Sequence, residues 1–341
     1  MGSVSPLIAV WQKLKEKDSK IEVLFVGTKN GPEREFVGRY QLPYQAISAG
    51  KLRRYFSLWN IFDVLKIILA IFQSFNLLRK FKPDIIISAG SFVGVPLIWA
   101  SKFFKCQVLL YQPDLKAGLA NKLCQNIATG IFTAFPETVK NFPPNKAEYL
   151  GSLFRNEILQ VLPQPANHQP TILVLGGGTG SAFINQIIKQ ALPKLLKHYR
   201  IIHVSGREKN NEFRIMNYES GKYQVFEILK DNYYQMMAEA DLVVSRAGLS
   251  TLMELSYLGK PAILIPLPNS AQEQNAQYFQ QKNAALIFSQ KGLMPDKLIN
   301  EIDLLMNNRE KLSGLSDNVK KIFRHGSEKA IIDKIISLYE F

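Results

Sequence analysis

The sequence predicts an α/β protein made of two doubly wound, Rossmann-like domains. Short apolar runs typical of buried strands alternate with helical patterns along the whole chain, and this alternation occurs twice. Residues 162–170, rich in Pro, Asn and Gln, separate the two sets, and the charge density falls at the same point. We therefore expect an N-terminal domain over 1–161, a linker over 162–170 and a C-terminal domain over 171–341. The last helix is expected to pack back on the N-terminal domain.

The expected strands are short apolar runs, most of them bounded by polar, Gly or Pro residues. In the N-terminal domain they are 21–26, 84–88, 108–111 and 130–133. In the C-terminal domain they are 171–175, 200–204, 223–226, 241–244 and 262–265. Helical stretches separate them, which is the order of a doubly wound sheet.

The charge of the chain is concentrated in its first half. The 341 residues carry a formal net charge of +14. Residues 1–155 hold 21 basic and 10 acidic side chains, or +11, whereas 156–341 hold 21 and 18, or +3. The basic half indicates an anionic partner, either nucleic acid or a phospholipid surface. A hydrophobic content of 47% excludes a disordered or collagen-like chain, and Cys106 and Cys124 suit a reducing compartment.

Residues 51–82 combine an apolar helical stretch with basic flanks. Its longest uncharged run, 67–78, has 12 residues, fewer than the ~20 that span a bilayer. Because the first 24 residues also lack a signal-peptide pattern, we expect a soluble or peripheral protein. Helical spacing predicts a core stripe of Leu58, Ile61, Phe62, Leu65, Ile68, Leu69 and Phe72. Trp59, Val64, Ile67, Ile71, Phe75 and Leu78 fall outside it. Such a helix is either buried on all sides or in contact with a membrane interface.

A glycine-rich turn follows the expected strand 171–175. It contains Gly177, Gly178, Thr179 and Gly180 and leads into an apolar helix near Ala182. Backbone N–H groups of such a turn, together with the helix N-terminus, favour a phosphate group; the alternative is a tight turn that serves packing alone. The Lys of a P-loop is absent, and so is the acidic residue that a dinucleotide fold places ~20 positions further on.

Two further segments follow strands of the C-terminal domain. In 245–254, Gly248 allows close backbone approach, Ser250 and Thr251 could cap the next helix, and Glu254 could accept from a ribose diol. In 269–276, side-chain amides such as that of Gln272 suit sugar hydroxyls. Each segment can also be explained without a ligand, as helix capping or as a polar loop.

The N-terminal domain has three loops of similar character. Residues 88–96 and 111–121 each follow an expected strand, and 151–155 place the cation Arg155 at the domain junction. Turn chemistry or a surface cation would explain them equally well. His168, His198, His203 and His325 form no metal-binding or triad pattern.

Taken together, these segments resemble the MurG family of bacterial N-acetylglucosamine transferases. Residues 245–254 resemble its R-x-G-x-x-T-x-x-E segment, 272–276 its Q-x-x-N-A signature, and 177–180 its second glycine loop. Residues 117–121 resemble A-G-L-x-N, and 151–155 resemble G-N-P-V-R. The resemblance covers nearly the whole chain. It implies the GT-B architecture, in which the two domains face a cleft; epimerases and some binding proteins share this architecture.

The resemblance also implies roles. At the donor, UDP-N-acetylglucosamine, it places Arg155, Gly177, Gly178, Thr179, Gly180, Lys230, Gly248, Leu249, Ser250, Thr251, Leu252, Met253, Glu254 and Gln272. In acceptor-side loops it places Gly2, Ser3, Gly90, Ser91, Phe92, Tyr111, Gln112 and Asn121. At the membrane we expect Trp59, Phe62, Ile67, Ile71 and Phe75. Glu254 would hold the ribose, Lys230 would bind uracil through its backbone, and Gln272 would contact the sugar.

The resemblance implies partners and a location as well. The acceptor would be lipid-linked muramyl-pentapeptide, and the protein would be peripheral on the cytoplasmic face of the bacterial cell membrane. Anionic phospholipid would then account for the basic half, and nucleic acid is disfavoured as a partner. Cell-wall synthesis proteins are further expected partners. No metal cofactor is expected.

The beginning of the chain departs from the family pattern. Met1 lies inside the first glycine loop, the strand before it is absent, and Ser3 replaces the family His. Because that strand is central in a doubly wound sheet, we expect a gap at the core. We further expect either a reading frame that starts upstream or a defective fragment.

The expected reaction is an inverting transfer in which a muramyl 4-hydroxyl displaces UDP. Backbone N–H groups, helix N-termini and Arg155 would stabilise the leaving diphosphate. Asp114 is the candidate general base, although it could simply fix the turn before Ala117. Alternatives are a UDP-sugar transferase acting on another lipid, or a non-catalytic sugar-nucleotide-binding membrane protein.

Overall fold

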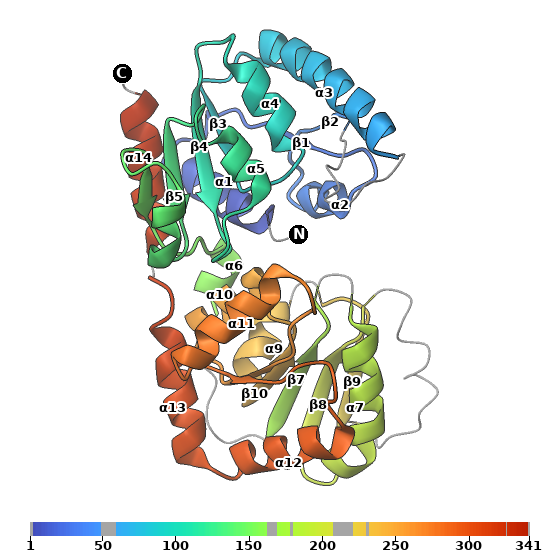
Figure 1. Cartoon of the computed structure of the whole chain (residues 1–341). Helices are drawn as coiled ribbons and strands as arrows, with labels where there is room; N and C mark the ends of the chain where they lie inside the picture. The colour runs from blue at the N-terminus through green and yellow to red at the C-terminus, as the bar shows by residue number, and fades with distance from the viewer. Residues whose placement is uncertain are drawn as a thin grey trace. The chain divides into compact units, whose positions relative to one another are not determined.

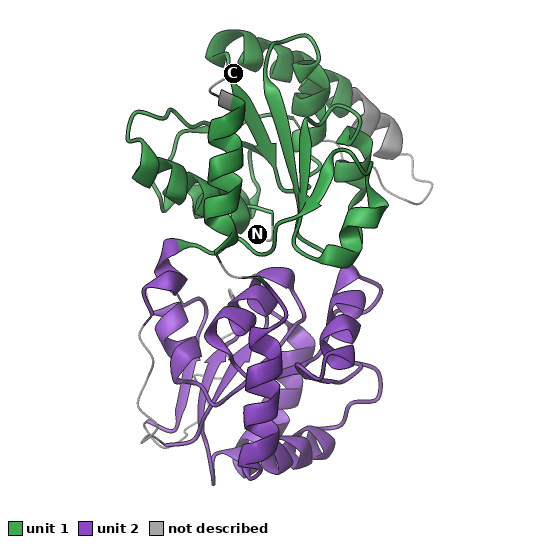
Figure 2. Ribbon diagram, turned by 90° about the vertical axis from the view of Figure 1, so that its left-hand side faces the viewer, with its two compact units in different colours: residues 1–155, 324–341 green, residues 156–323 purple. Residues whose placement is uncertain are grey.

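The computed structural model describes residues 3–48, 59–161, 169–177, 180–206, 221–229, 232–324 and 326–339. The chain forms two compact units (Figure 2). Unit 1 comprises Met1–Arg155 together with Arg324–Phe341, and unit 2 comprises Asn156–Phe323. The structural boundary thus falls just before the linker expected over 162–170, of which 162–168 lie outside the described residues.

The main sheet of unit 1 has four parallel strands in the order β3-β4-β5-β6. They are β3 (Ile85–Ser88), β4 (Gln107–Gln112), β5 (Gly130–Thr133) and β6 (Ala147–Tyr149). Two strands that precede them, β1 (Phe25–Gly27) and β2 (Tyr44–Ala46), pair in parallel as a separate sheet. The described part of the N-terminal sheet is therefore divided between β1 and β3.

The helices of unit 1 are α1 (Ser5–Lys17), α2 (Pro32–Gly38), α3 (Trp59–Phe81), α4 (Gly94–Ser101), α5 (Leu119–Cys124) and α14 (Ser327–Tyr339), with the 3-10 turn η1 (Pro136–Asn141). Proline stands in the first turn of α1 and of α2, where its missing N–H costs no hydrogen bond. The last helix, α14, belongs to this unit and packs against α1 (Figure 1). The Ser327 hydroxyl at its start donates to the Leu150 carbonyl at 2.7 Å.

Unit 2 has one continuous sheet of six parallel strands in the order β12-β11-β10-β7-β8-β9. They are β7 (Thr171–Leu175), β8 (Arg200–Val204), β9 (Tyr223–Phe226), β10 (Leu242–Ser245), β11 (Ala262–Leu264) and β12 (Leu286–Ile287). The helices are α6 (Asn156–Leu159), α7 (Ala182–Leu195), α9 (Tyr233–Glu239), α10 (Leu249–Leu258), α11 (Ala271–Gln281), α12 (Pro295–Met306) and α13 (Arg309–Lys320). All five residues of the inner strand β7 are buried.

These two units confirm the predicted α/β class with parallel sheets. The bounds of β5, β7, β8 and β9 are as predicted, and β3, β4, β10 and β11 differ by one residue at one or both ends. The first expected strand, 21–26, is shortened to Phe25–Gly27, and β2, β6 and β12 were not anticipated.

The predicted core stripe of α3 is wrong where the structure describes its side chains. Ile68, Leu69 and Phe72 are exposed, whereas Ala70 and Leu78 are buried. The buried stripe of α3 instead runs along Ala70, Ser74 and Leu78. Small residues in this stripe let α4 pack closely against α3 (Figure 1). In the described part of the chain, no helix combines the length and apolar character needed to span a bilayer.

Candidate active site

The glycine-rich turn lies at the carboxyl end of β7, the edge where open parallel sheets bind ligands. Gly180 has φ +76°, and a Cβ there would overlap the carbonyl oxygen of Ser205. At Gly176 a Cβ would overlap the backbone N of Ser181. The turn thus requires glycine for its close approach to β8, while Gly177, with φ +83°, has open space beside it. Gly178 and Thr179 lie outside the described residues.

The helix that leaves this turn begins with a side-chain cap. Ser181 is the N-cap of α7, and its Oγ accepts a hydrogen bond from the N–H of Ile184 at 3.2 Å. A 14-residue helix directed away from a glycine turn presents a positive N-terminal end to an anion. This arrangement is compatible with a phosphate site at the turn, which stays a prediction.

The second segment follows β10, the strand adjacent to β7. Helix α10 begins at Leu249 with Gly248 as N-cap and no side-chain cap. The prediction that Ser250 and Thr251 cap this helix is therefore wrong, because both lie inside its first turn with helical backbone. Leu252 and Met253 are buried, and the Leu252 backbone N–H donates to the Gly248 carbonyl at 3.0 Å within the helix.

Glu254 lies in α10 with its side chain 8% exposed. The Tyr233 hydroxyl donates to its Oε2 at 2.8 Å, and the Tyr234 hydroxyl donates to its Oε1 at 3.2 Å. Both tyrosines open α9. Neither tyrosine was predicted from the sequence, where the signal available was an adjacent Tyr pair at the start of a short helix.

Arg246, the cation of the R-x-G segment, forms hydrogen bonds within unit 2. Its Nη1 donates to the carbonyls of Ile265 and Pro266, each at 3.0 Å, and its Nη2 donates to Gln290 Oε1 at 2.8 Å. Burial lowers the pKa of its guanidinium. Arg246 therefore ties the end of β10 to the loop after β11.

The third segment places Gln272 beside the second. Gln272 lies in the first turn of α11, and its Oε1 accepts from the backbone N–H of Leu267 at 3.0 Å. Its Nε2 would lie 4.0 Å from a Cβ built on Gly248. The loops after β10 and β11 thus converge, and the Gln272 amide faces the backbone at the start of α10.

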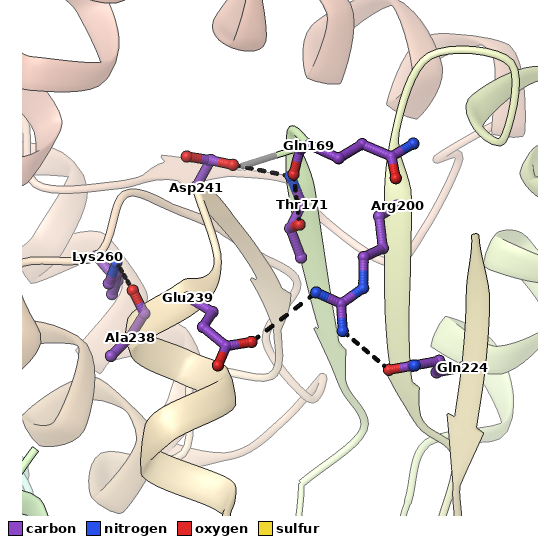
Figure 3. A network of polar contacts seen from close by, with 8 residues as sticks. All are labelled: Gln169, Thr171, Arg200, Gln224, Ala238, Glu239, Asp241 and Lys260. Carbon is purple, nitrogen blue, oxygen red and sulfur yellow. Dashed lines mark hydrogen bonds and ion pairs between the residues drawn. The ribbon is translucent and has the colours of Figure 1, made fainter. Parts of the chain in front are cut away.

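The opposite edge of the same sheet carries a purely structural network (Figure 3). The Asp241 carboxylate accepts from the Thr171 N–H at 2.8 Å, and Arg200 contacts Glu239 at 3.8 Å. The half-buried Lys260 donates through its ammonium to the carbonyls of Ala238 and Ala240. These groups hold the amino ends of the strands together, so the candidate ligand-binding groups of unit 2 gather at the carboxyl edge.

In unit 1, four predicted acceptor-side residues form one cluster. The buried Asn121 side chain donates to the Tyr111 carbonyl at 3.1 Å and to Gln112 Oε1 at 2.8 Å. Gly90, with φ +80°, has the same amide 3.2 Å from where its Cβ would lie. The loops after β3 and β4 therefore pack together through Asn121, and Ser91 and Phe92 continue the first of them.

The remaining predicted residues of unit 1 are held locally. Asp114 is half-buried, and its backbone carbonyl accepts from Gln112 Nε2 at 2.9 Å. The Arg155 guanidinium lies 5.2 Å from the Phe36 ring centre and donates to the Tyr40 hydroxyl at 3.0 Å. Ser3 is half-buried just before α1, while Gly2 and Lys230 lie outside the described residues. No group of three or more potential metal-ligating side chains occurs among the residues with described positions.

Two α/β units, each with parallel sheets, define the class of GT-B proteins, and unit 2 carries the glycine, Glu254 and Gln272 loops at one sheet edge. Residues 1–133 match the model of the glycosyltransferase family 28 N-terminal domain, and residues 171–331 match its C-terminal domain. The chain belongs to glycosyltransferase family 28.

Curated relatives and solved structures agree with this assignment. A protein of Clostridium novyi (strain NT), named UDP-N-acetylglucosamine--N-acetylmuramyl-(pentapeptide) pyrophosphoryl-undecaprenol N-acetylglucosamine transferase, is 33% identical, covering 99% of this chain and 95% of the relative. MurG of Acinetobacter baumannii has a similar structure, with a TM-score of 0.75, 24% identity and coverage of 98% and 96%. The glycosyltransferase SsfS6 of Streptomyces sp. SF2575, complexed with thymidine diphosphate, has a TM-score of 0.64, 13% identity and coverage of 98% and 97%.

Proposed function

We propose that this protein transfers N-acetylglucosamine from UDP-N-acetylglucosamine to the 4-hydroxyl of undecaprenyl-pyrophosphoryl-N-acetylmuramoyl-pentapeptide, with inversion at the anomeric carbon. The observation that carries the proposal is the arrangement of loops at the carboxyl edge of the unit 2 sheet. The glycine turn follows β7, helix α10 with Glu254 follows the adjacent strand β10, and the Gln272 amide faces Gly248 at the start of that helix. Relatives named for this activity, 33–35% identical to this chain, support the choice of donor and acceptor.

The donor residues act through charge and backbone. The glycine turn before α7 and the first turn of α10 direct N–H groups towards the diphosphate, which gains negative charge as the sugar leaves. Glu254 accepts from the ribose hydroxyls, Lys230 binds uracil through its backbone, and the Gln272 amide contacts the sugar. Arg155 adds positive charge for the diphosphate.

Asp114 is the proposed general base of the transfer. It follows β4, next to the cluster of Gly90, Gln112 and Asn121, and Gln112 holds its backbone in place. The carboxylate takes the proton of the acceptor hydroxyl as the oxygen attacks and UDP departs. Asp114→Asn is expected to lower kcat by about 10²-fold or more. An unchanged kcat in single-turnover measurements would refute this assignment.

The acceptor is lipid-linked, and unit 1 has a matching surface that we call the α3–α4 patch. It consists of exposed apolar residues on the two helices and the turn after them, namely Ile68, Leu69, Phe72, Phe75, Trp99 and Phe103. Exposed cations lie along the same elements, namely Lys66, Arg79, Lys80, Lys102 and Lys105. Apolar side chains among cations describe contact with an anionic phospholipid surface at the cytoplasmic face of the membrane.

This patch differs from the membrane residues expected from the sequence. Phe75 is 39% exposed and contacts Phe103 edge-on at 6.1 Å, as part of the patch. Ile67 and Ile71 are half-buried, because they lie closer to the stripe that faces α4. Their place at the proposed membrane surface is taken by Ile68, Leu69 and Phe72. The side chains of Trp59 and Phe62 lie outside the described set.

A direct assay tests the proposed function. The full chain is mixed with UDP-N-acetylglucosamine and the lipid-linked muramyl-pentapeptide in anionic vesicles, and UDP release is followed. Release that requires this acceptor is expected. Release with a different polyprenyl acceptor instead would identify a transferase with another lipid substrate.

A second candidate function is favoured by the divided sheet of unit 1. If the separation of β1 from β3 leaves the acceptor loops misplaced, the chain is a UDP-sugar-binding protein without transfer. UDP binding by calorimetry without UDP release in the presence of acceptor would support this candidate.

A further inference from the structure

The exposed apolar surface of unit 1 continues beyond the α3–α4 patch. Two further leucines, Leu119 and Leu123, are 42% and 36% exposed and lie one turn apart on α5, so they share a face of that helix. Helix α4 contacts both α3 and α5 (Figure 1). The two leucines therefore extend the apolar surface of unit 1 onto a third helix.

Trp99 joins the α5 leucines to the patch. Its indole N–H donates to the Leu123 carbonyl at 3.3 Å. Phe103 follows in the turn after α4, and its ring contacts that of Phe75 on α3 edge-on at 6.1 Å. We call Leu119, Leu123, Trp99 and Phe103 the apolar track. An exposed apolar surface that continues over several elements is typical of an interaction site.

The two ends of the track have different surroundings. Leu119 opens α5, and the N–H of Gly118 just before it donates at 3.1 Å to Oε1 of Gln112, one of the predicted acceptor-side residues. Lys116 and Lys122, which flank Leu119 in the sequence, are exposed cations that suit a diphosphate. The other end of the track belongs to the α3–α4 patch. The track thus runs from a cationic end beside the acceptor-side loops to the proposed membrane surface.

We propose that the apolar track binds the part of the acceptor's polyprenyl chain next to the diphosphate, and that Lys116 and Lys122 bind the diphosphate itself. The inference rests on the proposed function, in which the acceptor is lipid-linked. A polyprenyl chain is apolar from its first isoprene unit, so any part drawn out of the bilayer exposes hydrocarbon to water. Contact with the leucine and tryptophan side chains removes this surface from water and stabilises the bound acceptor.

The exposure of the side chains favours a single chain over the bilayer itself as the occupant of the α5 end. Phe103 and Phe72 of the patch are 78% and 67% exposed, and side chains that project so far can insert into a bilayer. Trp99 and the two α5 leucines are only 36% to 42% exposed. Side chains that are more than half covered form a shallow surface, on which one hydrocarbon chain can lie.

The test uses two water-soluble acceptors that share the muramyl-pentapeptide diphosphate and carry either a geranyl or an ethyl group, so no membrane is present. The KM of the full chain for the geranyl acceptor is expected to be about tenfold lower, because its hydrocarbon is partly buried on the track. Leu119→Ser and Leu123→Ser should each reduce this preference about threefold, and the double variant should bring it close to one. Leu304→Ser, at a 59% exposed leucine of α12 in unit 2, is the matched control and should keep the preference. Replacing Lys116 and Lys122 together by Gln should raise the KM of both acceptors by the same factor, because both carry the diphosphate.

Each other outcome has a distinct meaning. Equal KM values for the two acceptors, or transfer only to the undecaprenyl acceptor in vesicles, would overturn the inference and leave the proposed function standing. Leucine variants that keep the preference but bind anionic vesicles more weakly would assign α5 to the membrane contact instead, and an unchanged KM in the lysine variant would overturn the diphosphate contact. If UDP is released with none of the three acceptors, the proposed function fails and the inference fails with it. Thermal unfolding of each variant beside Leu304→Ser separates an effect on binding from lost stability.

Discussion

The two units follow one topological plan, but they differ at its centre. In unit 2, helix α7 comes directly after β7, which pairs with both β8 and β10. In unit 1, α1 leads to β1 and β2 as α7 leads to β8 and β9, yet no described strand precedes α1. The position that β7 fills in unit 2 corresponds to the division between β1 and β3 in unit 1.

Burial shows the consequence of this difference. Ile201 and Val243, on the two strands that flank β7, are fully buried. Phe25 and Val26 on β1 and Ile87 on β3 remain half-buried, although their sequences are as apolar as those of unit 2. Parallel strands are buried where helices cover both faces of the sheet, and an inner strand is also covered by neighbours on both edges. The difference teaches that apolar composition predicts a strand but not its burial.

The largest expected effect comes from adding a strand at the division between β1 and β3, where the described residues of unit 1 have none. Residues 171–180, the strand and glycine turn of unit 2, are fused ahead of Ser3. Burial of four apolar side chains contributes about 6 to 12 kcal/mol, and ordering the strand offsets much of this, so unit 1 should gain stability and its Tm should rise. A fusion with Ser in place of the Ile, Leu and Val residues is the control. Equal Tm values for the two fusions would show that the added strand does not occupy the division between β1 and β3.

The next effect is a pH dependence of unit 2. Burial lowers the pKa of His203 from 6.5 to about 3, and Tyr223 and Asn185 hold its ring at 2.9 and 3.1 Å. The unfolded chain takes up a proton as the pH falls below about 6.5 and the folded chain does not, so stability is full above this pH and declines towards pH 3. Up to about 3 kcal/mol is lost between pH 6.5 and 4.

The measurement is urea unfolding of unit 2 at several pH values. His203→Gln should lower stability at neutral pH but remove this part of the acid dependence. An acid dependence as steep as that of the unmodified protein would assign the loss to carboxylates instead. Among the described residues, histidines occur in unit 2 alone, and the prediction concerns that unit.

A smaller effect compares the packing of the two sheets directly, by making the same Val→Ala substitution in one strand of each. Val174→Ala in β7 removes fully buried methyl groups and should cost about 2 to 3 kcal/mol, whereas Val26→Ala in β1 should cost about 1 kcal/mol. Denaturant unfolding with a probe in each unit measures both values. Equal costs would show that β1 is packed as well as β7 in solution.

The smallest effect concerns the α3–α4 patch, a surface for which unit 2 has no proposed counterpart. Phe72→Ser should weaken binding to anionic vesicles by about tenfold, because Phe72 is 67% exposed and its burial in the interface is worth about 1.5 kcal/mol. Leu304→Ser, at a 59% exposed residue of unit 2, is the control. Co-sedimentation with vesicles measures the binding of both variants. Equal binding of the two would show that α3 is not part of the membrane contact.

The sequence by itself determined the fold class and the positions of the loops that we propose to bind the donor. Strands such as 171–175 and 200–204 could be predicted because both their faces are buried, so the whole run is apolar. The glycine turn was recognisable because close backbone approach excludes side chains, and that requirement acts on consecutive residues.

Only the tertiary structure decided which side chains work together. The contact of Tyr233 and Tyr234 with Glu254 joins residues about twenty positions apart, and no periodicity encodes it. Arg246 donates to backbone carbonyls because β11 ends beside β10. Ile68 and Phe72 are exposed because α4 packs on the small residues of the opposite face of α3. Local patterns report whether a residue is apolar, while orientation and partners depend on which element packs beside it.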